Sequence, residues 1–420
     1  MQAEAKPPSP FAYPAWRAFF VSRLASTIAF MMLVVVVAWQ VYDIARATRS
    51  IAESAFILGL VGLVQFVPVF LLGPLVGNVV DAMDRRHVAR AAIALEIGCA
   101  LALAGLASLE VSDLSPWFLV AFLIGVGRAF AAPAVAALAP NLVPPAVLPT
   151  AIAWSSIAWQ SGAVLGPVAG GLLYDMAAPL PHAAAAALLT LALVALFRIP
   201  PVPRPERTSR GLAAVREGLA YVRGNPIVFG AISLDLAAVV LGGATAMLPV
   251  YARDILEAGP QALGWLRAAP AIGAGVVALA LARRPLQARV GRAMFAGVAL
   301  FSLMTIVFAF SKAIWLSMLA LIIMGGADMV SVYVRASLIQ LHTPDAMRGR
   351  VSAVSMMFIS ASNELGEFRS GMVAAAIGPV AATALGGALA LGVTLLWARL
   401  FPALREADRF EVPAPLRQGP

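Results

Sequence analysis

Residues 77–86 read GNVVDAMDRR, a charged turn between two long apolar runs at about 55–80 and 88–109. Each run reaches the roughly 20 apolar residues that a helix needs to cross a bilayer. Two such runs joined by a short basic turn are typical of a protein that crosses the membrane repeatedly. The turn therefore predicts a membrane fold.

The composition of the chain favours the same class. Of its 420 residues, 61% are hydrophobic and 12% are charged, whereas soluble domains have roughly 45–50% apolar and 25% charged residues. Twelve crossings would use about 240 residues, close to the apolar total. With one cysteine and three histidines, a disulfide scaffold and most metal centres are excluded. We expect no metal and no cofactor.

Twelve apolar runs predict an all-α membrane protein. The runs are long, rich in Ala, Leu and Gly, and lack alternation at period two, so barrel strands are excluded. They lie at about 19–42, 55–80, 88–109, 116–139, 150–174, 181–199, 227–251, 261–283, 292–310, 313–338, 351–376 and 379–401.

Arginines gather in alternate gaps between these runs, above all after the second, sixth and eighth. This positive-inside pattern accounts for the net charge of +9 without nucleic acid and places both termini in the cytoplasm. The gap at 139–149 is uncharged, although it is predicted to be cytoplasmic. The basic segment between the sixth and seventh runs is predicted to be a plain linker, and a regulatory or lipid-binding role is the alternative. We expect an N-terminal tail at 1–16 with no signal peptide, six-helix bundles at 17–199 and 227–401, a central linker at 200–226, and a C-terminal tail at 402–420.

A weak internal repeat relates the two bundles. Shifting the chain by 200 residues aligns glycines and a proline, which occur where helices pack closely or end. Two similar six-helix halves related by an axis along the membrane normal place a substrate site between the halves, near the midplane. The aligned pairs are Gly125 and Gly325, Pro144 and Pro344, Gly166 and Gly366, and Gly171 and Gly371.

Two motifs resemble those of the major facilitator superfamily. The first is the turn at 77–86, with a glycine, an aspartate four residues later and following arginines, although Ala82 and Asp84 depart from the common pattern. The resemblance implies a clamp between cytoplasmic helix ends, and a plain charged turn is the alternative. Its residues are Gly77, Asp81, Asp84, Arg85 and Arg86.

The second motif, GAVLGPVAGG at 162–171, resembles the antiporter motif of facilitator exporters. Its glycines recur every four residues and so line one helix face, while a proline kinks the axis. The resemblance implies export by exchange, and a generic packing face is the alternative. The residues concerned are Gly162, Gly166, Pro167, Gly170 and Gly171.

Further segments across about 17–400 resemble the enterobactin-exporter-like branch of this superfamily. They read WQVYD at 39–43, LPVYARDIL at 248–256, LGWLRAAP at 263–270, MRGRVS at 347–352 and SNELGEF at 362–368. The resemblance implies the major facilitator fold, proton-driven efflux of a siderophore or drug, and a conformational role for Arg348, Gly349 and Arg350.

Charged residues within the apolar runs are costly and normally mark a pathway. Glu364 and Glu367 share a helix face, and two carboxylates in a low dielectric cannot easily both be ionised, so one could bind and release a proton. Neutralisation by Arg369 is the structural alternative. Asp235 and Asp328 are the other candidate proton carriers. Arg128 and Asp328 share the 200-residue offset, so pairing with each other or within their own halves remains open.

Polar and aromatic residues inside the runs are candidates to line a cargo cavity, because such sites combine apolar walls with a few polar anchors. Packing is the alternative for each aromatic residue. The sequence contains arginines that suit an anionic siderophore and acids that suit a cationic drug, so the cargo charge stays open. The cavity candidates are Arg128, Arg335, Trp39, Gln40, Gln65, Trp159, Gln160, Tyr333 and Arg369.

The sequence as a whole favours a proton-coupled antiporter of the bacterial inner membrane that exports a small organic molecule by alternating access. It contains no nucleotide-binding loop, zinc motif or catalytic triad, so we do not expect an enzyme. The expected partners are the substrate, protons and the lipid bilayer, with no nucleic acid, and the family resemblance implies a monomer. An importer or uniporter on the same fold and a non-transporting receptor or scaffold are the alternatives.

Overall fold

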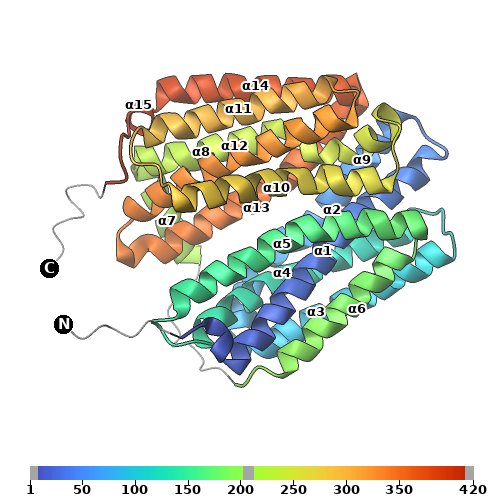
Figure 1. Ribbon diagram of the computed structural model, residues 1–420, viewed down its shortest axis with the longest axis horizontal. Helices are drawn as coiled ribbons and strands as arrows, with labels where there is room; N and C mark the ends of the chain where they lie inside the picture. The colour runs from blue at the N-terminus through green and yellow to red at the C-terminus, as the bar shows by residue number, and fades with distance from the viewer. Residues whose placement is uncertain (1–7, 202–211, 412–420) are drawn as a thin grey trace. The chain divides into compact units, whose positions relative to one another are not determined.

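The computed structural model describes residues 8–201 and 212–411 (Figure 1). This part of the chain is helical, without β-strands. Ten of its helices are long and apolar enough to cross a membrane. Helices α5 (Leu148–Met176) and α13 (Asp345–Ile377) are as long, at 29 and 33 residues, but more polar. With them, the twelve predicted crossings are all present as helices.

A short 3₁₀ turn, η1 (Pro10–Ala12), lies in the predicted N-terminal tail, and a second 3₁₀ turn, η2 (Ala139–Asn141), precedes α5. Proline stands in the first turn of several helices, where its missing N–H has no intrahelical partner to lose. The remaining helices are α1 (Pro14–Arg46), α2 (Ile51–Ala82), α3 (Arg85–Ser108), α4 (Ser115–Leu138) and α6 (Leu180–Phe197).

Helix α7 (Leu212–Gly224) lies within the predicted linker and precedes the second set of long helices. Asn225 caps the next helix by accepting hydrogen bonds from two backbone N–H groups of its first turn, which would otherwise lack partners. The set comprises α8 (Pro226–Gly242), α10 (Pro260–Arg283), α11 (Val290–Phe310), α12 (Ile314–Leu341), α13 and α14 (Pro379–Leu400), with α15 (Pro402–Arg405) after it.

The seventh apolar run, expected as one helix over 227–251, is interrupted. Gly243 ends α8 with a left-handed backbone at φ +30°, a conformation that glycine adopts without steric cost. Three short turns follow: η3 (Ala244–Met247), α9 (Leu248–Val250) and the π-helix η4 (Tyr251–Ile255). The hydroxyl of Ser370 on α13 stands where a side chain on Gly243 would be. Both the backbone conformation and the lack of space therefore favour a glycine at the break.

The chain divides into two compact units. Unit 1 comprises Met1–Ile44, Val64–Thr208 and Gly259–Trp265, and unit 2 comprises Ala45–Leu63, Ser209–Ala258 and Leu266–Pro420. Within unit 1, α3 packs against α4 and α6, and α5 lies along α1. Within unit 2, α11 packs against α12 and α14, and α8 packs against α13 and α14 (Figure 1). The predicted division into bundles at 17–199 and 227–401 stays a prediction.

Candidate functional site

Two glutamates on α13 point at one glycine of α2. A Cβ at Gly62 would lie 3.0 Å from Oε2 of Glu367 and 3.8 Å from Oε2 of Glu364. The acids are three residues apart and therefore share a face of α13. Both side chains are half-buried. All three residues belong to unit 2, so the acid pair, as we call Glu364 and Glu367, forms one local site.

Arg267 of α10 is the cation beside the acid pair. Its Nη2 lies 3.8 Å from Oε1 of Glu367, while its Nη1 donates a hydrogen bond of 3.3 Å to the carbonyl oxygen of Thr245. A separation of 3.8 Å is beyond hydrogen-bond length, and the Glu367 side chain is 32% exposed. Arg267 therefore attracts the carboxylate without holding it in a fixed hydrogen bond.

Small residues hold α13 close to its neighbours on either side of the acid pair. A Cβ at Gly366 would lie 2.8 Å from the carbonyl oxygen of Val239 on α8, and one at Gly371 would lie 2.8 Å from the Cα of Gly59 on α2. Arg369 donates a hydrogen bond of 2.7 Å to the carbonyl oxygen of Leu241, near the end of α8. Backbones at this distance leave little freedom for α13, so the position of the acid pair is well defined.

Asp235 and Arg335, predicted separately as a proton carrier and a cavity residue, form an ion pair between α8 and α12. Their side chains are only 9% and 8% exposed. A buried pair of this kind is costly to break because either partner alone would be an unpaired buried charge. Asp328, which precedes Arg335 on α12, is half-buried. Within the described residues it has no hydrogen bond or ion pair.

Two charged residues, Arg128 and Glu96, lie near each other in unit 1. The guanidinium carbon of Arg128 on α4 stands 4.4 Å above the ring centre of Phe30 on α1, a favourable cation–π distance. Glu96 on α3 packs on α4, because a Cβ at Gly127 would lie 2.9 Å from its Cγ. Arg128 is close enough to Glu96 to act on it electrostatically.

The remaining cavity candidates are dispersed over several helices. Gln40 is buried and its Oε1 lies 2.9 Å from Nε2 of His182, while Trp39 beside it is buried in α1. Trp159 is exposed beneath the guanidinium of Arg23, 5.4 Å from its ring centre. The others comprise Gln160, half-buried in α5, Gln65, whose backbone adjoins Gly125, and Tyr333, whose ring packs edge-on against Phe410.

The turn between α2 and α3 contains a capped helix start. Asp84 accepts hydrogen bonds from the backbone N–H of Arg86 and from its guanidinium, the shortest at 2.6 Å. These hydrogen bonds lower the pKa of Asp84 from 3.8 to about 2. Arg86 and Arg85 also donate to the carbonyl oxygens of Ile199 and Ala137. Gly77 and Asp81 belong to the same predicted motif, but the surroundings of Gly77 and the side chain of Asp81 lie outside what the structure describes.

The glycine motif of α5 packs on two helix segments. Gly162, Gly166 and Gly170 lie against α1, where a Cβ at Gly166 would be 2.6 Å from the carbonyl oxygen of Ile28. Gly171 lies against the start of α10, where a Cβ would be 3.2 Å from the Cα of Gly264. A Cβ at Gly264 would in turn be 2.5 Å from the carbonyl oxygen of Pro167. These contacts all lie within unit 1.

Residues of the segment at 347–352 connect α13 to α7. Arg350 forms an ion pair of 2.6 Å with Glu217 of α7, and Arg348 pairs with Asp345 at 2.8 Å in the first turn of α13. All four side chains are more than 40% exposed, so the pairs contribute little to stability. Gly349 has open space where a side chain would be.

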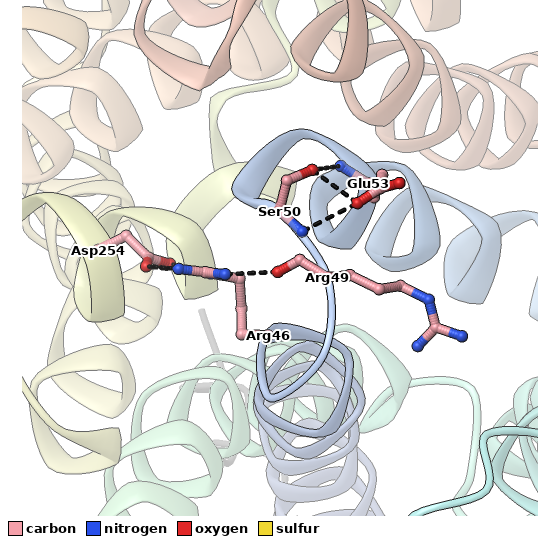
Figure 2. A network of polar contacts seen from close by, with 5 residues as sticks. All are labelled: Arg46, Arg49, Ser50, Glu53 and Asp254. Atoms are coloured by element: carbon pink, nitrogen blue, oxygen red, sulfur yellow. Dashed lines mark hydrogen bonds and ion pairs between the residues drawn. The ribbon is translucent and has the colours of Figure 1, made fainter.

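A polar network fixes the turn between α1 and α2 (Figure 2). Arg46 forms an ion pair of 3.0 Å with Asp254 of η4 and donates a hydrogen bond of 2.6 Å to the carbonyl oxygen of Arg49. Ser50 and Glu53 form a reciprocal capping box at the start of α2. All five residues belong to unit 2. The network therefore connects the start of α2 with the interrupted stretch after α8. Gly62 lies farther along the same helix.

Sequence reasoning missed Arg267, Gly62 and the pairing of Arg46 with Asp254. Arg267 had a visible signal, because it is the only charged residue within 261–282. Gly62 had none, because a glycine in an apolar helix has the same appearance whether or not an acid faces it. The ion pair joins residues 208 positions apart, and spacing along the chain cannot show such a contact.

Comparison with known proteins identifies the family. A family model described as Major Facilitator Superfamily matches residues 16–367. The enterobactin exporter EntS of Escherichia coli O81 (strain ED1a) is 28% identical over 96% of this chain and 95% of its own. Among solved structures, the POT family transporter PepTSo matches with a TM-score of 0.73 and 13% identity, covering 96% of this chain and 100% of that one.

The human organic anion transporter MFSD10 matches with a TM-score of 0.66 and 16% identity, covering 93% of this chain and 100% of that one. At these identities the structural matches show the fold, whereas the family model covers most of the sequence. Within residues 8–201 and 212–411, the twelve long helices that match the predicted crossings, ten of them apolar enough to cross a membrane, agree with that fold. The chain belongs to the Major Facilitator Superfamily and is a multi-pass membrane transporter, not an enzyme.

Proposed function

We propose that this transporter exports a small organic molecule in exchange for protons, and that the acid pair on α13 is the proton site. The observation that supports this most directly is the convergence of Glu364 and Glu367 on Gly62. Two half-buried carboxylates that converge on one point repel each other when both are ionised, so binding a proton there lowers the energy of the pair. A site of this kind can take up a proton on one side of the membrane and release it on the other.

Arg267 fits this proposal as a counter-charge to Glu367. The 3.8 Å separation and the partial exposure of both side chains leave the carboxylate free to exchange a proton. The buried pair of Asp235 and Arg335 is the less suitable proton site, because protonating Asp235 would leave a buried cation without its partner. We therefore propose the acid pair as the proton site, with Asp328 as the second candidate.

The direction and the cargo are supported by the relatives and by α5. The matching E. coli protein is named as an enterobactin exporter, and the glycine face of α5 resembles the motif of exporters that work by exchange. We propose a siderophore or a drug-like compound as the cargo. The cavity candidates, including Arg128 and the other arginines, are proposed to line its path.

Alternating access is the proposed mode of movement, with two six-helix halves at 17–199 and 227–401 that rock within the bacterial inner membrane and with both termini in the cytoplasm. Two glycine contacts suit such a motion. Gly59 meets Gly371 within unit 2, and Gly171 meets Gly264 within unit 1. Each joins a helix of one proposed half to a helix of the other. In the proposed cycle, these contacts are made in one state and opened in the other. We propose that a single copy of the chain is sufficient.

Inverted membrane vesicles test this function. Cells produce the full chain, the vesicle interior is acidified, and accumulation of enterobactin and, separately, of ethidium is measured. We expect at least one of the two probes to accumulate, and to be released when nigericin collapses the pH gradient. The variant E364Q/E367Q should accumulate neither above background, because it has lost the proton site.

The matched control is E110Q, which removes an exposed acid from the loop between α3 and α4 and should keep full accumulation. Exchange of labelled for unlabelled cargo without a pH gradient should persist in E364Q/E367Q, which shows that the variant is folded. Undiminished gradient-driven accumulation in the double variant would contradict the proton role of the acid pair. Failure of the wild-type chain to move either probe would contradict the proposed cargo classes.

A further inference from the structure

A small basic cavity lies at the end of unit 2, between the start of α11 and the segment after α14. Its volume is about 180 Å³. Three of its lining side chains are arginines and two are acids. The six lining residues are Arg289, Arg292, Arg405, Glu406, Ala407 and Asp408.

Backbone hydrogen bonds give this cavity a fixed frame. The N–H groups of Val290 and Gly291 donate to the carbonyl oxygens of Asp408 and Ala407, at 3.2 and 2.9 Å. Leu404, just before the cavity segment, is fully buried in a hydrophobic cluster with residues of α8, α11 and α12. The walls of the cavity are therefore held by the packed core of unit 2.

The charges around the cavity are only partly neutralised. Arg405 pairs with Glu406 at 2.7 Å, and Asp408 accepts a hydrogen bond from the backbone N–H of Arg289 and lies 3.7 Å from Nε of Arg409. Within the described residues, the guanidinium groups of Arg289 and Arg292 have no ion pair or hydrogen-bond partner. Both side chains are exposed. The cavity thus presents two free cationic groups at its rim.

The position of the cavity determines which anions reach it. Helices α11 and α14 are both apolar enough to span a membrane, and the cavity lies where the first begins and just past the end of the second. This is the level of the lipid headgroups. The neighbouring segments at 283–292 and 399–411 contain seven arginines against three acidic residues. Basic segments beside a membrane attract anionic headgroups.

We propose that this arginine cavity binds a phosphate group, presented by an anionic phospholipid of the surrounding membrane. The planar guanidinium offers paired donors that match the oxygens of a phosphate, and two free guanidinium groups at one rim can hold it from two sides. Zwitterionic lipids have the same phosphate but no net negative charge. The site therefore prefers phosphatidylglycerol to phosphatidylcholine.

Native mass spectrometry of the purified full chain in detergent tests this proposal. Phosphatidylglycerol, phosphatidylcholine and inorganic phosphate are titrated separately, and the bound fraction is measured. We expect phosphatidylglycerol to bind more tightly than either other probe. The variant R289Q/R292Q should weaken phosphatidylglycerol binding by roughly tenfold, since it loses charge-assisted hydrogen bonds.

The matched control is R283Q/R284Q, which removes the same charge from exposed arginines in the same connection but outside the cavity lining. It should bind phosphatidylglycerol as the wild type does. R292Q alone provides a milder second variant, because Arg292 lies on the exposed face of α11. Equal binding of both lipids, unchanged binding in R289Q/R292Q, or an equal loss in R283Q/R284Q would overturn the proposal. Binding of inorganic phosphate without a preference for the lipid would overturn the lipid source.

Discussion

Helices α5 and α13 occupy equivalent places in the two repeats, yet they differ in charge. Gly166 packs on α1 and Gly366 packs on α8, while Gly171 meets α10 and Gly371 meets α2. The same 200-residue offset therefore relates both the residues and the helices that they contact. The repeat has preserved the close backbone contacts that each helix makes with its neighbours.

The residues between these glycines do not follow the repeat. Where α5 has Val164, Pro167 and Ala169, α13 has Glu364, Glu367 and Arg369. In unit 1 the carbonyl oxygen of Pro167 faces Gly264 of α10, whereas in unit 2 the carboxylate of Glu367 faces Gly62 of α2. The comparison teaches that α5 and α13 share their close packing and that, at these positions, only α13 is charged. A charged site on α13 without a counterpart on α5 is consistent with a dedicated proton site.

The largest expected effect is a difference in the free energy of unfolding between a variant of the buried Asp235–Arg335 ion pair and a variant of the acid pair. D235N should lower the free energy of unfolding by about 3–5 kcal/mol, because it leaves Arg335 as a buried unpaired cation. E367Q should lower it by less than about 1 kcal/mol, because its pair with Arg267 is long and partly exposed. Thermal unfolding in detergent measures both. Equal losses would mean that the charges of α13 are structural, and the comparison with α5 would lose its functional meaning.

A second test uses the shared packing. G166A and G366A should each lower the free energy of unfolding by about 1–3 kcal/mol, because the added Cβ meets a backbone carbonyl of the neighbouring helix. Chemical denaturation of both variants gives the comparison. G98A and G392A are the controls, because nothing lies within 4 Å of either added Cβ, and each should gain about 0.5–1 kcal/mol from helix propensity. A large loss at only one of Gly166 and Gly366 would break the proposed equivalence.

The third and smallest effect concerns the starts of α3 and α11, which are also equivalent in the repeat. Asp84, directly before α3, accepts a hydrogen bond from the backbone N–H of Arg86 in the first turn of that helix. Asp408, which follows α14, accepts one from the backbone N–H of Arg289, directly before α11. Because folding lowers the pKa of Asp84 from 3.8 to about 2, its contribution is complete above pH 4 and is lost as the pH falls towards 2. D84A should therefore cost about 2 kcal/mol at pH 7 and less at pH 3.

Unfolding of wild type and D84A at both pH values provides the measurement. D408A is the counterpart in unit 2 and should cost less, because the Asp408 side chain is 61% exposed. A loss in D84A that does not change between pH 7 and pH 3 would show that the carboxylate charge is not its cause.

The helices were predictable from the sequence because long apolar runs have few alternatives in a membrane. The break at Gly243 was not predicted, because residues 227–251 are mostly apolar and long enough for one crossing. The hydroxyl that lies beside this glycine comes from Ser370 on α13. The central linker appeared in the sequence as a proline-rich, basic stretch, and its helical end is present as α7. Local composition was sufficient for these elements but did not show where the seventh run is interrupted.

The candidate site divides in the same way. The spacing of Glu364 and Glu367 predicted that they share a face, and this is how α13 presents them. Which helix they face could not be predicted, because that depends on how α2 packs against α13. The pairing of Asp235 with Arg335 likewise joins residues 100 positions apart. Each charge was recognisable as costly in an apolar run, but its partner was visible only in the fold.

The central claim is that the acid pair couples cargo movement to proton movement. Proteoliposomes containing the full chain and an internal pH dye test it directly, with an enterobactin gradient imposed and no initial pH gradient. The account predicts that the wild-type chain moves protons against the direction of the cargo, and that E364Q/E367Q lets cargo pass without proton movement. Cargo movement in the wild type without proton counterflow, or unchanged proton counterflow in the double variant, would contradict it.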